Sequence, residues 1–135
     1  MSPYWYHEEN MNQITGRSIK IDPSSHVAIK SFLDRNPNGS IEIGKDCTIC
    51  EGTYILVHDA STKVVGLPGR FGKVKIGNNV FIGINCNILM DTTIGDNVII
   101  GAGSTISGNI PSNEVWGGCP AKFIKSIEDF KIANK

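Results

Sequence analysis

Large apolar residues recur at every sixth position through the second half of the chain. From Val74 to Ile110, isoleucine stands at 76, 82, 88, 94, 100 and 106, and a smaller or β-branched residue stands two positions before each. This period matches neither the repeat of an α-helix nor the two-residue alternation of one long strand. A fixed short period of this kind indicates a solenoid, in which each repeat stacks on the next.

Each six-residue unit predicts one short strand and one corner. Residues i and i−2 of a strand point to the same side, so each isoleucine and the small residue before it face inward. Gly77–Asn79 and Gly95–Asn97 predict corners, because Gly and Asn tolerate the positive φ of a tight turn. Three corners close a triangular coil, and residues eighteen apart then stack at a spacing of about 4.8 Å. The predicted core columns are Ile76 with Ile94, Ile82 with Ile100, and Ile88 with Ile106.

The first half of the chain continues this period less regularly. Inward residues are predicted at 21, 27 and 33, but the next one, Ile43, comes ten positions after Leu33 instead of six. The extra residues fall in the turn sequence Asn36–Gly39. The period then resumes through Ile55. We therefore predict an all-β solenoid of about four coils over residues 19–111.

A larger interruption separates Ile55 from Ile76, which are twenty-one positions apart where six are expected. About fifteen residues, within 57–73, are therefore predicted to leave one corner as a single long loop. Its glycines and its proline predict no regular structure. Its basic residues are Lys63, Arg70 and Lys73. Long loops on a rigid scaffold often carry function.

Both ends of the chain fall outside the repeat, and solenoids need capped ends. Residues 1–18 predict an N-terminal cap, in which Tyr4–Tyr6 covers the first coil or contacts a neighbouring subunit. Residues 112–135 predict a C-terminal extension with a short helix that opens at Cys119-Pro120 and covers the last coil. The whole chain, 1–135, is predicted to be one domain.

The balance of charge excludes several classes of partner. Lys plus Arg and Asp plus Glu both number 13, so no electrostatic footprint for nucleic acid or for an anionic membrane is present. No apolar run is long enough to span a membrane, and the N-terminus lacks the pattern of a signal peptide. We expect a cytoplasmic protein with no membrane insertion.

Four cysteines raise the question of a metal or redox site. Cys47-x-x-Cys50 matches half of a zinc ribbon. The repeat, however, places Cys47 and Cys86 at small inward positions, where a thiol behaves as a small apolar group. Because no second Cys-x-x-Cys or His pair follows, we favour packing and predict no metal.

The repeated [Ile/Val]-Gly-x4 pattern, the run IGAGS at 100–104 and the run GGCPAKFIKSI at 117–127 resemble the hexapeptide-repeat acyltransferases. The resemblance covers roughly Ile41–Ile127 and is closest to the sugar, galactoside and maltose O-acetyltransferases. It implies a left-handed parallel β-helix, acetyl-CoA as co-substrate with no metal required, and a homotrimer with sites at its interfaces. Phe81 and Ile99, apolar at outward strand positions, are consistent with a subunit contact.

His58 is the candidate general base. It stands at the start of the long loop, where a histidine is the base in the resembling family, and imidazole suits that task because its pKa lies near working pH. The alternative is an ordinary surface histidine beside Asp59. A base needs an orienting partner, for which Asp59, Glu51 and a backbone carbonyl are the candidates, and Asp59 could instead bind the acceptor.

The resemblance also implies a donor site. Coenzyme A would contact the main chain at Ile84 and Ala102, a hydroxyl at Ser107, and the ammonium groups of Lys122 and Lys125 through its phosphates. The structural alternative makes Ser107 a corner residue and the lysines an exposed helix face.

The family's pattern is not matched everywhere. This chain has Gly108-Asn109 where relatives carry Lys-Asp, and Cys119 where they carry asparagine. The first change removes one possible contact to a phosphate, and neither change touches the thioester chemistry.

The resemblance favours an acetyl-CoA-dependent O-acetyltransferase acting on a hydroxyl of a sugar or a surface-polysaccharide precursor. An amino-sugar nucleotide or serine as acceptor would need much the same machinery. A γ-class carbonic anhydrase shares the solenoid but needs three histidines on zinc, and only His26 and His58 lie in the repeat region. A non-catalytic scaffold is the third possibility, although a scaffold needs neither the long loop nor the basic C-terminal segment.

Overall fold

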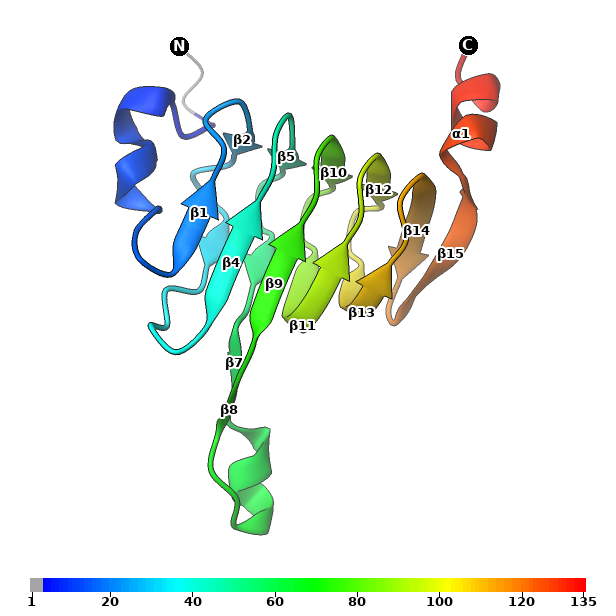
Figure 1. The fold of residues 1–135 in the computed structure, drawn as a ribbon. Coiled ribbons are helices and arrows are strands. Elements are labelled where there is room, and N and C mark those ends of the chain that lie inside the picture. The colour runs from blue at the N-terminus through cyan, green and yellow to red at the C-terminus, as the bar shows by residue number, and fades with distance from the viewer. Residues whose placement is uncertain (1–3) are drawn as a thin grey trace.

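The computed structural model describes residues 4–135, which wind into a parallel β-helix. Figure 1 shows the strands side by side along one axis, with an arm that projects from the middle of the solenoid. The predicted count of about four coils is confirmed. The first coil contains β1 (Ile19–Ile21), β2 (His26–Val27) and β3 (Phe32–Leu33), and the second contains β4 (Ser40–Ile43), β5 (Thr48–Ile49) and β6 (Tyr54–Ile55). The third coil contains β9 (Lys73–Ile76), β10 (Val80–Ile82) and the first half of β11 (Asn87–Ile94). The fourth coil contains the second half of β11, β12 (Val98–Ile100) and the first half of β13 (Thr105–Ile110).

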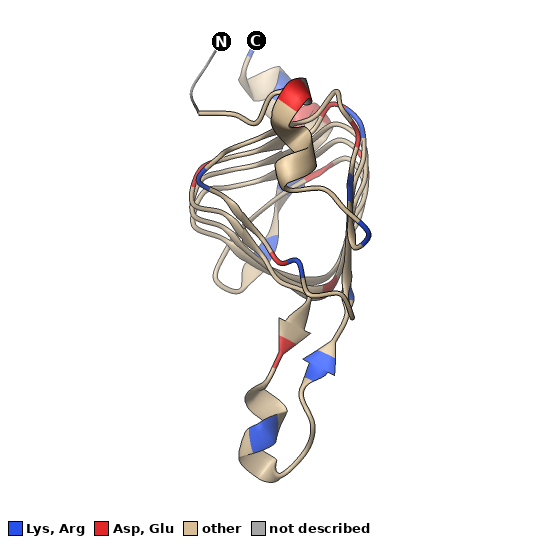
Figure 2. Cartoon of the chain, turned by 90° about the vertical axis from the view of Figure 1, so that its left-hand side faces the viewer, with Lys and Arg blue, Asp and Glu red and all other residues tan. Residues whose placement is uncertain are grey.

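The strands form three faces of parallel neighbours. The first face holds β1, β4, β9 and the second halves of β11 and β13. The second face holds β2, β5, β10, β12 and β14 (Glu114–Gly118), and the third holds β3, β6 and the first halves of β11 and β13. The long strands β11 and β13 turn from the third face to the first, with a break in register between Ile88 and Thr92. Figure 2 shows this arrangement end-on, with the arm leaving the lower side and the charged residues scattered over the coils.

The core is the set of isoleucine columns that the period predicts. Ile76 lies opposite Ile94, Ile82 opposite Ile100, and Ile88 opposite Ile106. All six side chains are at most 2% exposed. In the next strand Trp116 lies opposite Ile100 and packs against the same core, so it closes that column.

Asparagine supplies the corners between the first and second faces. Asn79, Asn97 and Asn113 have φ of 56°, 56° and 66°, the left-handed region that asparagine tolerates better than most residues. Their side chains also form a ladder from coil to coil: Asn79 Nδ2 donates to Asn97 Oδ1 at 2.8 Å, and Asn97 Nδ2 donates to Asn113 Oδ1 at 3.0 Å. These bonds fix the stacking of the corners.

The arm is more regular than its glycines and proline predict. β7 (His58–Asp59) and β8 (Arg70–Phe71) pair as an antiparallel stem, and η2 (Ser61–Val65) forms a 3-10 turn at the tip. Gly66 ends that turn with φ of 81°, a left-handed cap that glycine adopts without strain. The expectation of an irregular loop was therefore wrong, because the glycines lie at the ends of these elements and not inside them.

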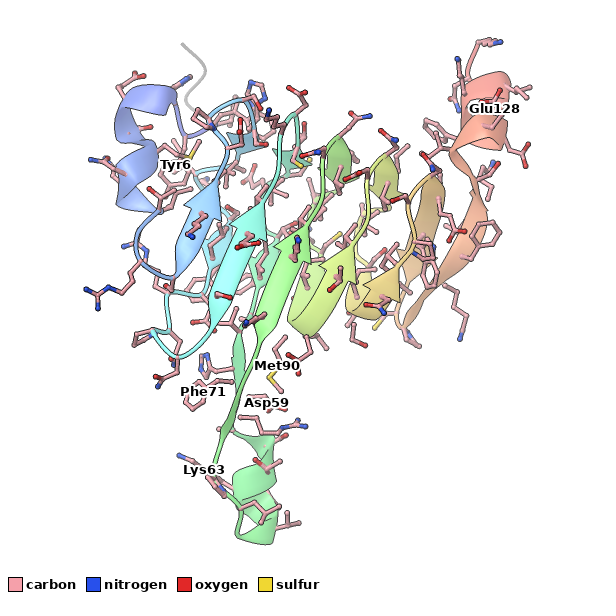
Figure 3. The ribbon with its side chains drawn as sticks, viewed as in Figure 1. Tyr6, Asp59, Lys63, Phe71, Met90 and Glu128 are labelled. Atoms are coloured by element: carbon pink, nitrogen blue, oxygen red, sulfur yellow. The ribbon has the colours of Figure 1, made fainter. Side chains whose placement is uncertain are left out.

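A short helical segment, η1 (Glu8–Gln13), covers the first coil. Met11 and Ile14 are buried, and Tyr6 packs against the core between η1 and β1 (Figure 3). Trp5 forms an antiparallel bridge with Ala28. The segment predicted as an N-terminal cap thus packs on the first coil through η1 and Tyr6, and its residues 1–3 lie outside the described part of the chain.

The C-terminal end differs from the prediction. A strand, β15 (Ala121–Ser126), follows Cys119-Pro120 and pairs antiparallel with β14, and the helix α1 (Ile127–Ala133) begins only afterwards. Without β15 the outer edge of β14 would expose unpaired backbone groups, and pairing with β15 satisfies them better than a helix would. Ser126 caps α1, because its Oγ accepts a hydrogen bond from Asp129 N at 3.0 Å.

The cysteines occupy the positions that the repeat assigns. Cys47 and Cys86 are free and fully buried in the core. Within residues 4–135, no three metal-ligating side chains lie together, and no helix is long and apolar enough to cross a membrane.

Truncating one core isoleucine should destabilise the whole solenoid. Ile82→Ala leaves a cavity in a column that cannot collapse, and should lower the free energy of unfolding in urea by about 2–5 kcal/mol. Ile84→Ala is the matched control, because Ile84 is 51% exposed only two residues away, and this change should cost less than about 1 kcal/mol. Equal losses in the two variants would contradict the assignment of the columns.

Candidate active site

The two interruptions of the repeat lie at the same corner of the solenoid. The turn after Leu33 and the arm after Ile55 both leave the corner between the third and first faces, and Leu33 pairs with Ile55. The backbone joins them, since Asp34 N donates to Ile55 O at 2.9 Å. Gly72 N closes the root of the arm with a hydrogen bond to Val57 O at 2.8 Å. Two irregular segments are thus held against each other by regular strands.

This contact pairs Asp34 with His58. Asp34 Oδ2 lies 2.5 Å from His58 Nδ1, and it also accepts a hydrogen bond from Val57 N at 3.0 Å. Asp34 Oδ1 accepts from Asn36 N at 3.1 Å. The Asp34 side chain is 6% exposed, whereas that of His58 is 47% exposed. The carboxylate is therefore fixed inside the corner, and the imidazole reaches from it toward solvent.

The environment keeps Asp34 ionised. Burial acts to raise the pKa of Asp34, but the hydrogen bonds from Val57 N, His58 and Asn36 N together outweigh it, so the pKa lies below its ordinary value. An ionised carboxylate only accepts hydrogen bonds, so His58 Nδ1 must carry the proton between them. In a neutral imidazole the other nitrogen, Nε2, then holds a free lone pair.

Asp59 has a different partner. Its Oδ2 lies 2.5 Å from Arg70 Nη2 across the stem of the arm, and Ser61 donates to Asp59 from its backbone N and its Oγ. The hydrogen bonds from Ser61 and Arg70 lower the pKa of Asp59 to about 2. Asp59, Glu51 and a backbone carbonyl were the orienting partners expected for His58. Asp34, which was not among them, is the partner of His58 Nδ1 in the structure.

A cavity of about 510 Å³ opens beside His58. The arm contributes Asp59, Ser61 and Arg70, and the coils contribute the remaining wall. Three of the residues predicted for the site, His58, Asp59 and Ser107, thus line one space. The other lining residues are Leu56, Leu89, Met90 and Asp91.

The remaining predicted donor residues lie elsewhere on the last coils. Ile84 and Ala102 occupy neighbouring coils at the corner between the second and third faces, where Gly103 N donates to Ile84 O at 2.9 Å. Lys122 lies opposite Gly117 in β15, and Lys125 lies opposite Val115. The lysines therefore stand on a strand and not on the expected helix. These four positions do not line the cavity of His58, and only a long ligand could contact both places.

Comparison with known proteins places the chain in a family. The family described as "Bacterial transferase hexapeptide (six repeats)" matches residues 73–108. The galactoside O-acetyltransferase of Escherichia coli (strain K12) is 48% identical over 136 residues, which cover 90% of this chain and 67% of that protein. The chain therefore belongs to the hexapeptide-repeat transferases.

Solved structures share the fold. A maltose O-acetyltransferase from Clostridium difficile 630 is 34% identical, with a TM-score of 0.58 over 82% of this chain and 64% of that one. A hexapeptide-repeat acetyltransferase of Vibrio cholerae, solved with acetyl coenzyme A, has a TM-score of 0.74 at 22% identity over 82% of this chain and 61% of that one. The predicted left-handed parallel β-helix is confirmed. The chain spans less than two thirds of both solved chains.

The stability contributed by Asp34 should depend on pH. Because its pKa is lower in the folded chain, the contribution is present above the ordinary carboxyl pKa and is lost as pH falls through the folded value. The difference in free energy of unfolding between the wild type and Asp34→Asn, measured in urea, should therefore be largest near pH 6 and shrink toward about pH 3. A difference that stays constant over this range would contradict the ionised state of Asp34.

Proposed function

We propose that the chain is an acetyl-CoA-dependent O-acetyltransferase whose acceptor is a hydroxyl of a sugar or a surface-polysaccharide precursor. The observation that carries the proposal is the Asp34–His58 pair at the mouth of a cavity large enough for a sugar ring. A buried carboxylate that orients a half-exposed imidazole is the arrangement of a general base. Two relatives in different organisms are named as sugar O-acetyltransferases.

In this mechanism His58 Nε2 accepts the proton of the acceptor hydroxyl while the hydroxyl oxygen attacks the thioester carbonyl. Asp34 stabilises the imidazolium that forms, because its carboxylate remains bonded to Nδ1. The tetrahedral intermediate then collapses, the C–S bond breaks, and the thiolate of coenzyme A takes the proton from Nε2. The acetyl group moves from sulfur to oxygen directly, so no acyl-enzyme is needed.

The donor assignment rests on the resemblance in sequence. Coenzyme A would extend from the cavity of His58, past Ser107, to the corner that carries Ile84 and Ala102. Lys122 of β15 lies opposite Gly117, and the backbone of Gly117 lies next to Gly101, the residue before Ala102. We infer that the flexible side chain of Lys122 carries the ammonium to a phosphate at that corner. Lys125 stands farther along the same strand.

We further infer that the protein acts as a homotrimer. Phe81, Phe32 and Tyr54 expose 43–50% of their surface on the outward sides of the second and third faces. Exposed aromatic side chains of this kind are typical of subunit contacts. A neighbouring solenoid would cover them and complete the groove for the donor.

A substitution of the base tests the proposed mechanism. His58→Ala should lower kcat for acetyl transfer to methyl glycosides by about 10²–10⁴-fold, because proton removal loses its catalyst. Release of free coenzyme A thiol measures the rate, and circular dichroism checks that the fold is intact. Unchanged turnover would remove His58 from the mechanism, and absence of any turnover in the wild type would favour the non-catalytic scaffold.

Asp34→Asn separates charge from structure. The asparagine oxygen can still accept the hydrogen bond from Val57 N, but the side chain has no negative charge to stabilise the imidazolium that forms, so kcat should fall on the order of 10²-fold or more. Asp59→Asn is the control, since Asp59 pairs with Arg70 and not with His58, and it should lower kcat less than Asp34→Asn does. Equal losses in the two variants would contradict the role of Asp34.

A further inference from the structure

The repeat explains why one wall of the cavity is apolar. The position after each inward residue of the third face holds Asp34, Leu56, Leu89 and Ser107 in successive coils, as the pairing of the strands requires. Successive members of this row stand about 4.8 Å apart. Two leucines therefore separate the residue that orients the base from the hydroxyl of Ser107.

The corner after Leu89 extends this wall. Thr92 Oγ1 donates to Leu89 O at 2.6 Å, and Asp91 has φ of 61°, so the corner is tightly fixed. This turn directs Met90 toward the arm, where Figure 3 shows it close to Asp59. Leu56, Leu89 and Met90 are all half-buried and offer the cavity only carbon and sulfur.

The polar part of the cavity carries more negative than positive charge. Arg70 is already paired with Asp59, whose oxygens receive further bonds from Ser61. Asp91 Oδ1 accepts only a long bond from Lys73 N, at 3.3 Å, and within residues 4–135 Asp91 forms no ion pair. Its carboxylate is therefore open to a donor from a ligand, and it repels an anion.

We propose that Leu56, Leu89, Met90 and Asp91 select the acceptor, which is an uncharged sugar that turns a methyl group to the apolar wall and a hydroxyl to Asp91. A 6-deoxyhexoside has this chemistry. A hexoside would place a hydroxyl against the wall without a partner, and a hexuronate would bring a second negative charge to Asp91. This inference rests on the proposed function, because it assigns the substrate class of the same site.

Kinetics with three methyl glycosides test the selection. With acetyl-CoA as donor, kcat/KM for methyl α-D-fucoside should exceed that for methyl α-D-galactoside by about tenfold, and the value for methyl α-D-galacturonide should be lowest, since the three differ only at C6. Leu89→Asn should bring the fucoside and galactoside values together, and Met90→Gln serves as the second variant if Leu89→Asn does not fold. Asp91→Asn should raise the galacturonate value alone. Equal values for all three sugars in the wild type would overturn the proposal.

A binding measurement keeps this inference separate from the proposed function. The chain has three methionines, so the methyl signal of Met90 can be followed by NMR with ¹³C-methyl methionine and identified with Met90→Leu. The signal should shift with methyl α-D-fucoside more than with the galactoside, and least with the galacturonate. If the galacturonate shifts it equally, or if only coenzyme A shifts it, the acceptor assignment fails while acetyl transfer itself can still be observed. If the fucoside shifts it but no thiol is released, the proposed function fails instead.

Discussion

The stacking of isoleucine on isoleucine every eighteen residues is the constraint on which the rest of this molecule depends. Each coil alone has two inward residues on a strand and cannot bury them, so only the neighbouring coils make the core. The period therefore has to be kept wherever the chain remains in the solenoid. Residues can still be added at a corner, because a corner points outward and an insertion there does not disturb the columns.

Both large additions in this chain use the same corner, in consecutive coils. The first adds the turn that begins at Asp34, and the second adds the arm that begins near His58. Rigid strands below and above hold the two additions together at the hydrogen-bonding distance of a carboxylate and an imidazole. The chemistry of the site is thus positioned by stacking, although its residues lie twenty-four positions apart. The same stacking row then places the leucines of the cavity wall beside His58.

The six-residue period predicted the fold well, because it directly reflects which side chains face inward. The columns, the asparagine corners, the buried cysteines and the position of the arm all follow from it. The C-terminal strand was missed, since the spacing of Phe123, Ile124 and Ile127 fits a helix face, and only the open edge of β14 decides for a strand. The stem of the arm was not predicted. Glycine and proline occur at the ends of short strands and turns as well as in irregular loops, so their presence does not distinguish the two.

The site was predicted in part. His58, Asp59 and Ser107 line one cavity, whereas the orienting carboxylate was sought near His58 in sequence and was found one coil earlier. The sequence does contain an indication of Asp34. Asp34 directly follows the inward Leu33, just as Leu56, the residue in register with Asp34, directly follows the inward Ile55. The arm departs after Ile55. The stacking register, together with the period, therefore indicates Asp34 as the residue beside the root of the arm.

We propose that the cavity of His58 serves acetyl transfer from acetyl-CoA. A calorimetric titration of the purified protein with acetyl-CoA and with coenzyme A tests this most directly, because it needs no knowledge of the acceptor. The account predicts saturable binding of both ligands at one site per chain. No binding at about 1 mM ligand, the upper end of the usual range of KM values, would contradict it and leave the solenoid as a scaffold.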